Sequence, residues 1–147
     1  FAHNSTYANS FDMICLLDVF EHLYDYKSAL SGLRALLKKD GKILIVTPSS
    51  KGFPARILKK RWYHFLPPQH THLFNPENIT KFLQQYQFDV IRMEYVKKQF
   101  SVKYFSHILA GWVGINPPKW LNRWFGSFVF TFPLKDNMMI IAQKQNE

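Results

Sequence analysis

The spacing of hydrophobic residues changes twice between residues 11 and 48. Residues 11–17 form an apolar run, which is typical of a strand buried on both faces of a parallel sheet. Apolar residues then recur at helical spacing over residues 23–37, and residues 42–47 form a second apolar, β-branched run that stops at Pro48. A strand, a crossover helix and a strand make a right-handed unit with parallel strands, so the pattern predicts an α/β fold.

The predicted helix carries cap signals at both ends. Asp18 can cap its start, and Glu21 three residues later would complete a capping box. Lys38 and Lys39 would lie in the last turn, where the helix dipole favours cations, and Gly41 can supply a left-handed cap. These signals predict that one helix connects the two strands.

Further elements are predicted downstream from the same kinds of signal. Asn75 as N-cap, Pro76 at the first helical position and Asn78 in the first turn open another helix. The other elements are, in chain order, a short basic helix at residues 53–61, an ordered loop at 62–74, a strand at 88–97, two aromatic-rich amphipathic helices within 99–133 and a last strand at 137–144.

Two long stretches of the chain follow the motif order of a known family. They read FDMICLLDVFEHL…LLKKDGKILIVTP, within residues 11–48, and WYHFLPPQHTHLFNPENITKFLQQYQFDV, over residues 62–90. Together they resemble class I S-adenosylmethionine-dependent methyltransferases, most closely the ubiquinone-type O-methyltransferases and their relatives, many of which act on lipids or glycans. One departure lies at Lys39-Asp40-Gly41, where the family has K-P-G-G and Asp40 replaces the first glycine of the pair.

The resemblance implies a partial Rossmann-like methyltransferase sheet that starts at the family's fourth strand, residues 11–17. A helical, aromatic-rich insertion would precede the last strand, which by analogy lies antiparallel between the fifth and sixth strands. The family holds its cofactor, S-adenosylmethionine, mainly through a Gly-rich loop after its first strand. None of the six glycines here forms such a loop. Residues 1–147 are therefore expected to be a single domain, the C-terminal portion of a methyltransferase domain that lacks the Gly-rich cofactor-binding half.

Two readings of this chain follow. Either it is the acceptor-side portion of a methyltransferase, inactive alone, or it is a non-catalytic remnant that binds a membrane or a protein partner. In both cases the edge of the strand at residues 11–17 lacks the neighbour that the family provides. An exposed apolar edge strand invites pairing, so we expect dimerisation or strand exchange of the isolated chain.

The first candidate site is Asp18, Glu21 and His22, at the end of the first predicted strand. Ligands of open α/β sheets bind outside the carboxyl ends of the strands, and positions i, i+3 and i+4 share a helix face. Two carboxylates and an imidazole suit Mg²⁺, Mn²⁺ or Zn²⁺. The resemblance associates the corresponding segment with a divalent metal, although Asp18 stands where the family usually has Glu. The alternative is structural: a capping box, with His22 bonded to the backbone.

Candidate cofactor and catalytic residues come from the resemblance and from histidine chemistry. The resemblance places Leu17 where the family contacts the methionine part of the cofactor, with Asp18 beside it. His70, in a cluster with His64 and His72, is the preferred general base, because an oxygen acceptor must lose a proton. His22 is the second catalytic candidate. The alternative is that these histidines hold an irregular loop through backbone hydrogen bonds.

Composition adds information about partners. The chain has a formal net charge of +9, which favours an acidic partner, and a single cysteine, which excludes an internal disulfide and suits a reducing cytoplasm. In residues 100–125, Lys and Arg residues alternate with aromatic residues, which suits peripheral docking on an anionic membrane surface. Single-stranded nucleic acid is the less favoured partner, and a helical cap over the pocket for a small-molecule, lipid or glycan acceptor is the structural alternative. The bases and aromatics concerned are Lys103, Lys119, Arg123, Phe100, Tyr104, Phe105, Trp112, Trp120, Trp124 and Phe125.

Overall fold

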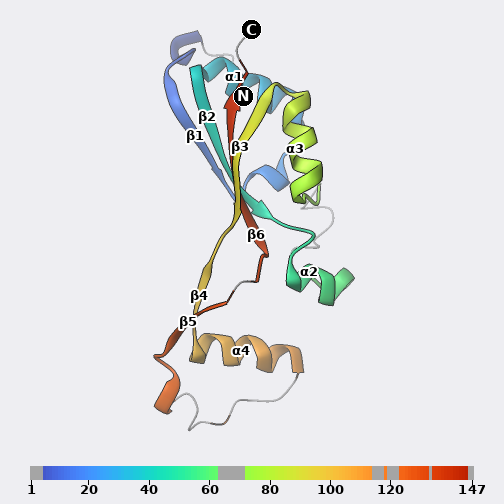
Figure 1. The fold of residues 1–147 in the computed structure, drawn as a ribbon, viewed down its shortest axis with the longest axis vertical. Coiled ribbons are helices and arrows are strands. Elements are labelled where there is room, and N and C mark those ends of the chain that lie inside the picture. Colours follow the sequence, from blue (N-terminus) through green and yellow to red (C-terminus); the bar gives the residue numbers. More distant parts are fainter. Residues whose placement is uncertain (1–4, 63–71, 114–117, 119–122, 133, 146–147) are drawn as a thin grey trace. The chain divides into compact units, whose positions relative to one another are not determined.

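The computed structural model describes residues 5–62, 72–113, 118, 123–132 and 134–145 (Figure 1). The chain divides into two compact units, one made of Phe1–Val96 with Lys135–Glu147 and the other of Lys97–Leu134. The first unit is a mixed α/β structure built on a four-stranded sheet. In spatial order its strands are β1 (Phe11–Leu17), β2 (Leu37–Pro48), β6 (Asn137–Lys144) and β3 (Phe88–Tyr95).

The sheet combines parallel and antiparallel pairing. β1 and β2 are parallel, and the crossover between them contains α1 (Tyr26–Leu36), so the predicted strand–helix–strand unit is confirmed. β6 runs antiparallel to both β2 and β3 and lies between them, as the resemblance implied for the last strand. Ile45 of β2 pairs with Leu16 of β1 and with Ile140 of β6, which fixes the register across the centre of the sheet.

One face of the sheet carries the hydrophobic core. α1 contributes Tyr26 and Leu30, and α3 (Pro76–Gln85) contributes Ile79 and Leu83, to one cluster with the central strands. The buried residues that complete this cluster are Phe20, Leu37, Ile43, Ile45, Phe74, Phe88, Met138, Ile140 and Ala142.

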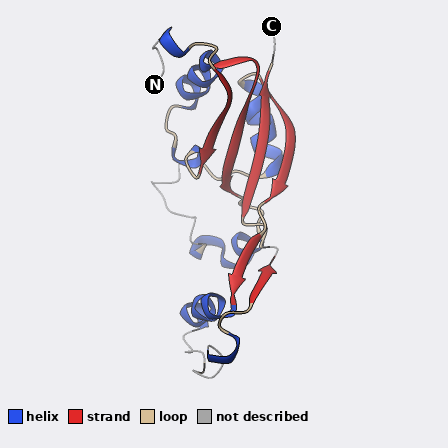
Figure 2. Ribbon diagram, turned by 90° about the vertical axis from the view of Figure 1, so that its left-hand side faces the viewer, coloured by secondary structure: helices blue, strands red, loops and turns tan. Residues whose placement is uncertain are grey.

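The opposite face of the sheet is apolar but open at β1. Met13, Cys15 and Leu17 are exposed there, Met13 by 45% and Leu17 by 57%. Cys15 pairs with Leu44, and Leu17 pairs with Val46, so the apolar surface continues onto β2. Figure 2 looks onto this face, with α3 behind the strands. The prediction that residues 11–17 are buried on both faces is therefore wrong, because β1 is an edge strand and the packed helices cover the other face.

The start of α1 differs from the prediction. Asp25, not Asp18, is the N-cap, and its side chain accepts a hydrogen bond from Ser28 N at 3.0 Å. Asp18 instead adopts a left-handed backbone conformation with a φ of 51° directly after β1. The predicted capping box of Asp18 and Glu21 is wrong, because a 3-10 turn, η2 (Phe20–His22), stands between β1 and α1.

The end of α1 also comes earlier than predicted. The helix stops at Leu36, and the following residues already belong to β2, where the register shifts against β1 between Phe11 and Met13. A Cβ atom at Gly41 would lie 2.8 Å from the Cβ of Leu37. Gly41 is thus required for a close approach inside an irregular strand, and its predicted role as a helix cap is wrong.

The segment between β2 and β3 follows the predicted order. The basic helix is split into α2 (Phe53–Leu58) and a 3-10 turn, η3 (Lys59–Arg61), at Lys59, whose φ is 48°. α3 begins at Asn75 as predicted, with a capping box completed by Asn78. The predicted loop at residues 62–74 lies mostly outside the described residues.

The second unit contains a short hairpin as well as a helix. β4 (Lys98–Ser101) and β5 (Val129–Phe132) pair antiparallel, and α4 (Val102–Val113) follows β4 directly. The prediction of two amphipathic helices within 99–133 missed this hairpin, because strands of four residues leave too little alternation to recognise.

Candidate functional site

Polar side chains gather where β1 and β2 end and β6 begins. Leu17 pairs with Val46, and Pro48 pairs with Asn137, so these three strand ends meet at one edge of the sheet. The polar residues at this edge are Asp18, Glu21, Thr47, Ser49, Asp136 and Asn137. Carboxyl ends of parallel strands are where open α/β sheets bind ligands, so this edge is the candidate functional site.

Glu21 and Thr47 form a buried hydrogen bond at this edge. Thr47 Oγ1 donates to Glu21 Oε2 at 2.9 Å, and the two residues are 0% and 3% exposed, respectively. Nearby, the hydroxyl of Tyr26 donates to the carbonyl of Phe20 at 2.9 Å. These bonds fix η2 against the end of β2 and the start of α1. The side chain of Glu21 therefore points into the protein.

Asp18 is held by two strands, β2 and the last strand, β6. Its backbone N donates to Val46 O at 2.9 Å, and its Oδ1 accepts a bond from Asn137 Nδ2 at 3.4 Å. Asn137 is itself fixed, since its backbone N donates to Asp136 Oδ1 at 3.0 Å. Leu17, just before Asp18, remains 57% exposed. The edge thus presents an apolar side chain next to an oriented carboxylate.

The metal prediction finds no support in the described part of the chain. Glu21 is buried against Thr47, whereas His22 and Asp18 are exposed. Among residues 5–62, 72–113, 118, 123–132 and 134–145, no group of three or more His, Cys, Asp or Glu side chains is arranged to hold a metal ion.

The structure describes His72, but His64 and His70 lie outside the described residues. The ring of His72 meets Tyr26 edge-on at 4.9 Å and stacks on Phe74 at 6.0 Å. The ring of His72 therefore contacts aromatic residues of the core.

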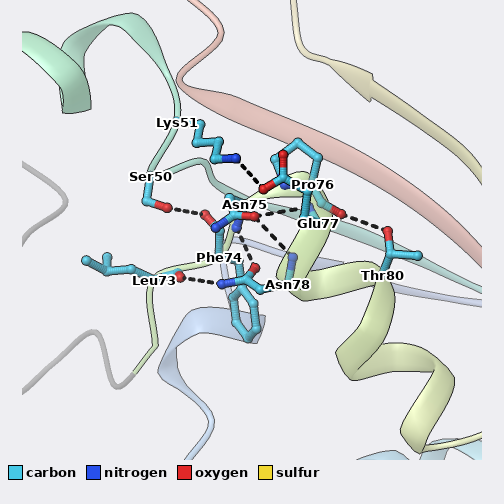
Figure 3. Close-up of polar contacts among 9 residues, drawn as sticks. All are labelled: Ser50, Lys51, Leu73, Phe74, Asn75, Pro76, Glu77, Asn78 and Thr80. Atoms are coloured by element: carbon cyan, nitrogen blue, oxygen red, sulfur yellow. Dashed lines mark hydrogen bonds and ion pairs between the residues drawn. The ribbon is translucent and has the colours of Figure 1, made fainter.

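A second network anchors the chain just after His72 (Figure 3). Ser50 Oγ donates to the carbonyl of Phe74 at 2.9 Å, and Lys51 forms an ion pair with Glu77. Asn75 Oδ1 accepts from the backbone N of Asn78 at 3.1 Å, which closes the cap of α3. The segment that follows β2 is thus bonded to the start of α3.

The sequence predicts Asp18 and Glu21 as site residues but not the side chains that bond them. Thr47 and Asn137 are predicted only as the end of one strand and the start of another. Asn137 lies 119 residues from Asp18 in the chain. The sequence does show a polar residue at each of these strand ends. That pattern indicates a shared site only once the strand order is known.

Within the described residues, no helix is long and apolar enough to cross a membrane.

Comparison with known proteins agrees with this fold. The family model of a methyltransferase domain matches residues 2–93, which is more than half of the chain, so the chain belongs to this family. No curated protein matches the sequence.

Solved structures with a similar fold are SAM-dependent methyltransferases. That of Thermotoga maritima has a TM-score of 0.57 at 14% identity, covering 94% of this chain and 58% of its own. The structure from Archaeoglobus fulgidus has a TM-score of 0.52 at 21% identity and covers 94% of this chain and 61% of its own. The structure from Methanosarcina mazei has a TM-score of 0.54 at 14% identity and covers 96% of this chain and 62% of its own. The chain thus spans about three fifths of the length of these proteins. At such identities the likeness shows the fold.

Proposed function

We propose that the complete protein transfers a methyl group from S-adenosylmethionine to a small-molecule, lipid or glycan acceptor, and that this chain forms its acceptor side. The observation that carries the proposal is the family match over residues 2–93 together with polar side chains gathered at the carboxyl edge of the sheet. The ubiquinone-type pattern of residues 11–48 and 62–90 supports an oxygen acceptor.

In methyl transfer the main task of the protein is to position the acceptor and the methyl donor. When bound, S-adenosylmethionine supplies a methyl group on a positively charged sulfur. The protein must hold the acceptor in line with that methyl group and exclude competing water. An oxygen nucleophile must also lose a proton, which requires a base.

Leu17 and Asp18 are the proposed cofactor contacts. The exposed side chain of Leu17 suits the aliphatic part of a methionine, and the carboxylate of Asp18 suits its ammonium group. Asn137 bonds Oδ1 of Asp18 at 3.4 Å and leaves Oδ2 for such a contact. The residues present therefore fit one side of the cofactor, while the Gly-rich loop that would hold the other side is absent from this sequence.

His70 is the proposed general base, and His22 is the second candidate. Phe74, four residues after His70, is bonded to Ser50 just beyond the end of β2, and this anchor supports a role near the same edge. If His70 is the base, His70→Gln lowers turnover in the complete protein, while His72→Gln, at a residue packed on Tyr26, serves as the matched control.

The proposal is tested by methyl transfer from radiolabelled S-adenosylmethionine into lipid, glycan and small-molecule extracts with the complete protein. We expect label in one fraction and at least about a tenfold loss of kcat/KM in Asp18→Asn, because a charge-assisted bond is removed. Asp12→Asn is the control: Asp12 lies on β1, the strand that Asp18 follows, but at its other end, where it pairs with Lys38. Absence of label in every fraction, or equal losses in both variants, contradicts the proposal.

The open apolar face also supports the alternative of a non-catalytic binding module, and with it self-association through β1. The other edge strand, β3, carries Arg92 paired with Glu94 on this face, which discourages pairing, whereas β1 presents Met13 and Leu17 there. We expect dimers of the isolated chain by light scattering and monomers after Met13→Lys. Ile91→Lys on β3 is the matched control, and a monomeric wild-type chain rules out the pairing.

A further inference from the structure

We propose that the second unit docks on the surface of an anionic lipid membrane through an exposed aromatic and basic surface. This surface, called here the aromatic–basic surface, consists of Lys103, Tyr104, Arg123, Trp124, Phe125, Phe128 and Val129. The inference is independent of methyl transfer, so its failure leaves the proposed function untouched, and the reverse also holds.

The second unit has an aromatic core of its own. Phe100 is buried, with 7% exposure, between the hairpin and α4. Its ring lies 6.4 Å from that of Phe130 on the paired strand, and Phe105 meets Phe130 edge-on at 5.3 Å. These contacts hold α4 on the β4–β5 hairpin.

Tyr104 of the aromatic–basic surface stacks on Phe100 of that core at 6.0 Å, yet the large side chains of the surface stay exposed. Trp124 is 77% exposed and Phe128 66%, and Tyr104, Phe125 and Val129 are each more than half exposed. Single exposed apolar residues are ordinary, but a contiguous exposed patch of large ones marks an interaction site.

Backbone hydrogen bonds bring the two segments of the surface together. Val102 N donates to Phe128 O at 2.9 Å, and Lys103 N donates to Gly126 O at 3.4 Å. The segment from Arg123 to Val129 is thus bonded to the first turn of α4, which carries Lys103 and Tyr104. Phe128 N also donates to Phe125 O at 3.0 Å, so the segment itself is turned and ordered.

The charge of the unit identifies the class of partner. Between Lys97 and Leu134 the sequence has five Lys or Arg residues, and all ten acidic residues of the chain lie elsewhere. Because residues 97–134 include basic but no acidic side chains, this unit attracts anions. Trp and Tyr prefer the level of lipid headgroups, and Lys and Arg pair with anionic headgroups.

The balance of apolar and basic side chains favours a membrane over a nucleic acid. The aromatic–basic surface has five large apolar side chains and two bases. Affinity for nucleic acid comes mainly from Lys and Arg side chains that neutralise phosphates, and two basic side chains supply few such contacts. Membrane-surface affinity grows with buried apolar area, which this surface offers, and anionic headgroups add to it.

The experiment is cosedimentation of the full chain with phosphatidylcholine vesicles that contain or lack phosphatidylserine. We expect binding to the phosphatidylserine vesicles, weakened by salt. Trp124→Ser with Phe128→Ser should weaken binding about tenfold for each aromatic removed, because each loses roughly the burial of a large side chain. Arg123→Gln should weaken it about fivefold. The control is Tyr24→Ser, at an aromatic of the first unit that is 79% exposed, and it should bind like wild type.

A second readout locates the contact. Trp124→Phe keeps an aromatic ring and should keep binding, but it should reduce the vesicle-induced blue shift in tryptophan emission. Equal binding of the Trp124→Ser/Phe128→Ser protein and wild type overturns the proposal. So does absence of binding to phosphatidylserine vesicles, or salt-dependent binding of a single-stranded oligonucleotide with none to vesicles.

Discussion

Replacing Thr47 by valine should destabilise the first unit, because it removes the only hydroxyl seen to bond Glu21 in the described residues. Valine keeps the shape of the side chain, so the change isolates the bond Thr47 Oγ1–Glu21 Oε2, which is 2.9 Å long and buried. A hydrogen bond to a carboxylate contributes about 1.5–3 kcal/mol to stability. For a chain of this size that corresponds to a loss of roughly 4–10 °C in Tm.

The assay is urea and thermal unfolding followed by circular dichroism. Thr131→Val is the matched control, because Thr131 is exposed on β5 and should change stability by less than about 0.5 kcal/mol. If Thr47→Val unfolds within that same margin of wild type, the bond between Thr47 and Glu21 does not stabilise this edge of the sheet.

A double-mutant cycle separates the pair from its surroundings. Glu21→Ala removes the acceptor of Thr47 Oγ1, as Thr47→Val removes the donor, so both single variants lose the same bond. The coupling energy between the two changes should be at least about 0.5 kcal/mol, since the residues are in direct contact. Additive effects would mean that each residue acts through other neighbours.

Three further predictions follow from single contacts. Gly41→Ala should cost about 1–3 kcal/mol, because its Cβ would lie 2.8 Å from that of Leu37, and an unchanged urea midpoint would contradict this close approach. Asn75→Ala should cost about 1 kcal/mol of stability by losing the cap of α3, and Asn75→Asp should restore most of it. Hydrogen bonds from Ser28 lower the pKa of Asp25, so their stabilising effect is present at neutral pH and is lost as the pH falls below about 4. Asp25→Asn should flatten that acid limb of a stability–pH curve, and an unchanged limb would refute the assignment.

Much of the fold was readable from local patterns. The bounds of β1 and β6 match the predicted strands, and Asn75 caps α3 as its sequence signals indicate. These features depend on neighbouring residues: apolar runs bounded by polar turns, and an Asn-Pro pair before an apolar periodicity.

Other features depend on contacts that sequence does not display. Asp18 and Asp25 are equally good caps by type, and the choice is made by the bond from Asn137 to Asp18 and by the left-handed backbone of Asp18. The exposure of β1 depends on which strands stand beside it. Thr47 and Asn137 are not predicted as site residues, because their side chains meet Glu21 and Asp18 only once the strands are assembled into the sheet.

We propose above that this chain is the acceptor-side portion of a SAM-dependent methyltransferase. The most direct test is isothermal titration of S-adenosylhomocysteine into this chain and into the protein together with whatever sequence its gene encodes upstream. We expect heat of binding only with the upstream sequence present, and weaker binding after Asp18→Asn. Binding to neither protein would contradict the methyltransferase proposal and favour the non-catalytic module.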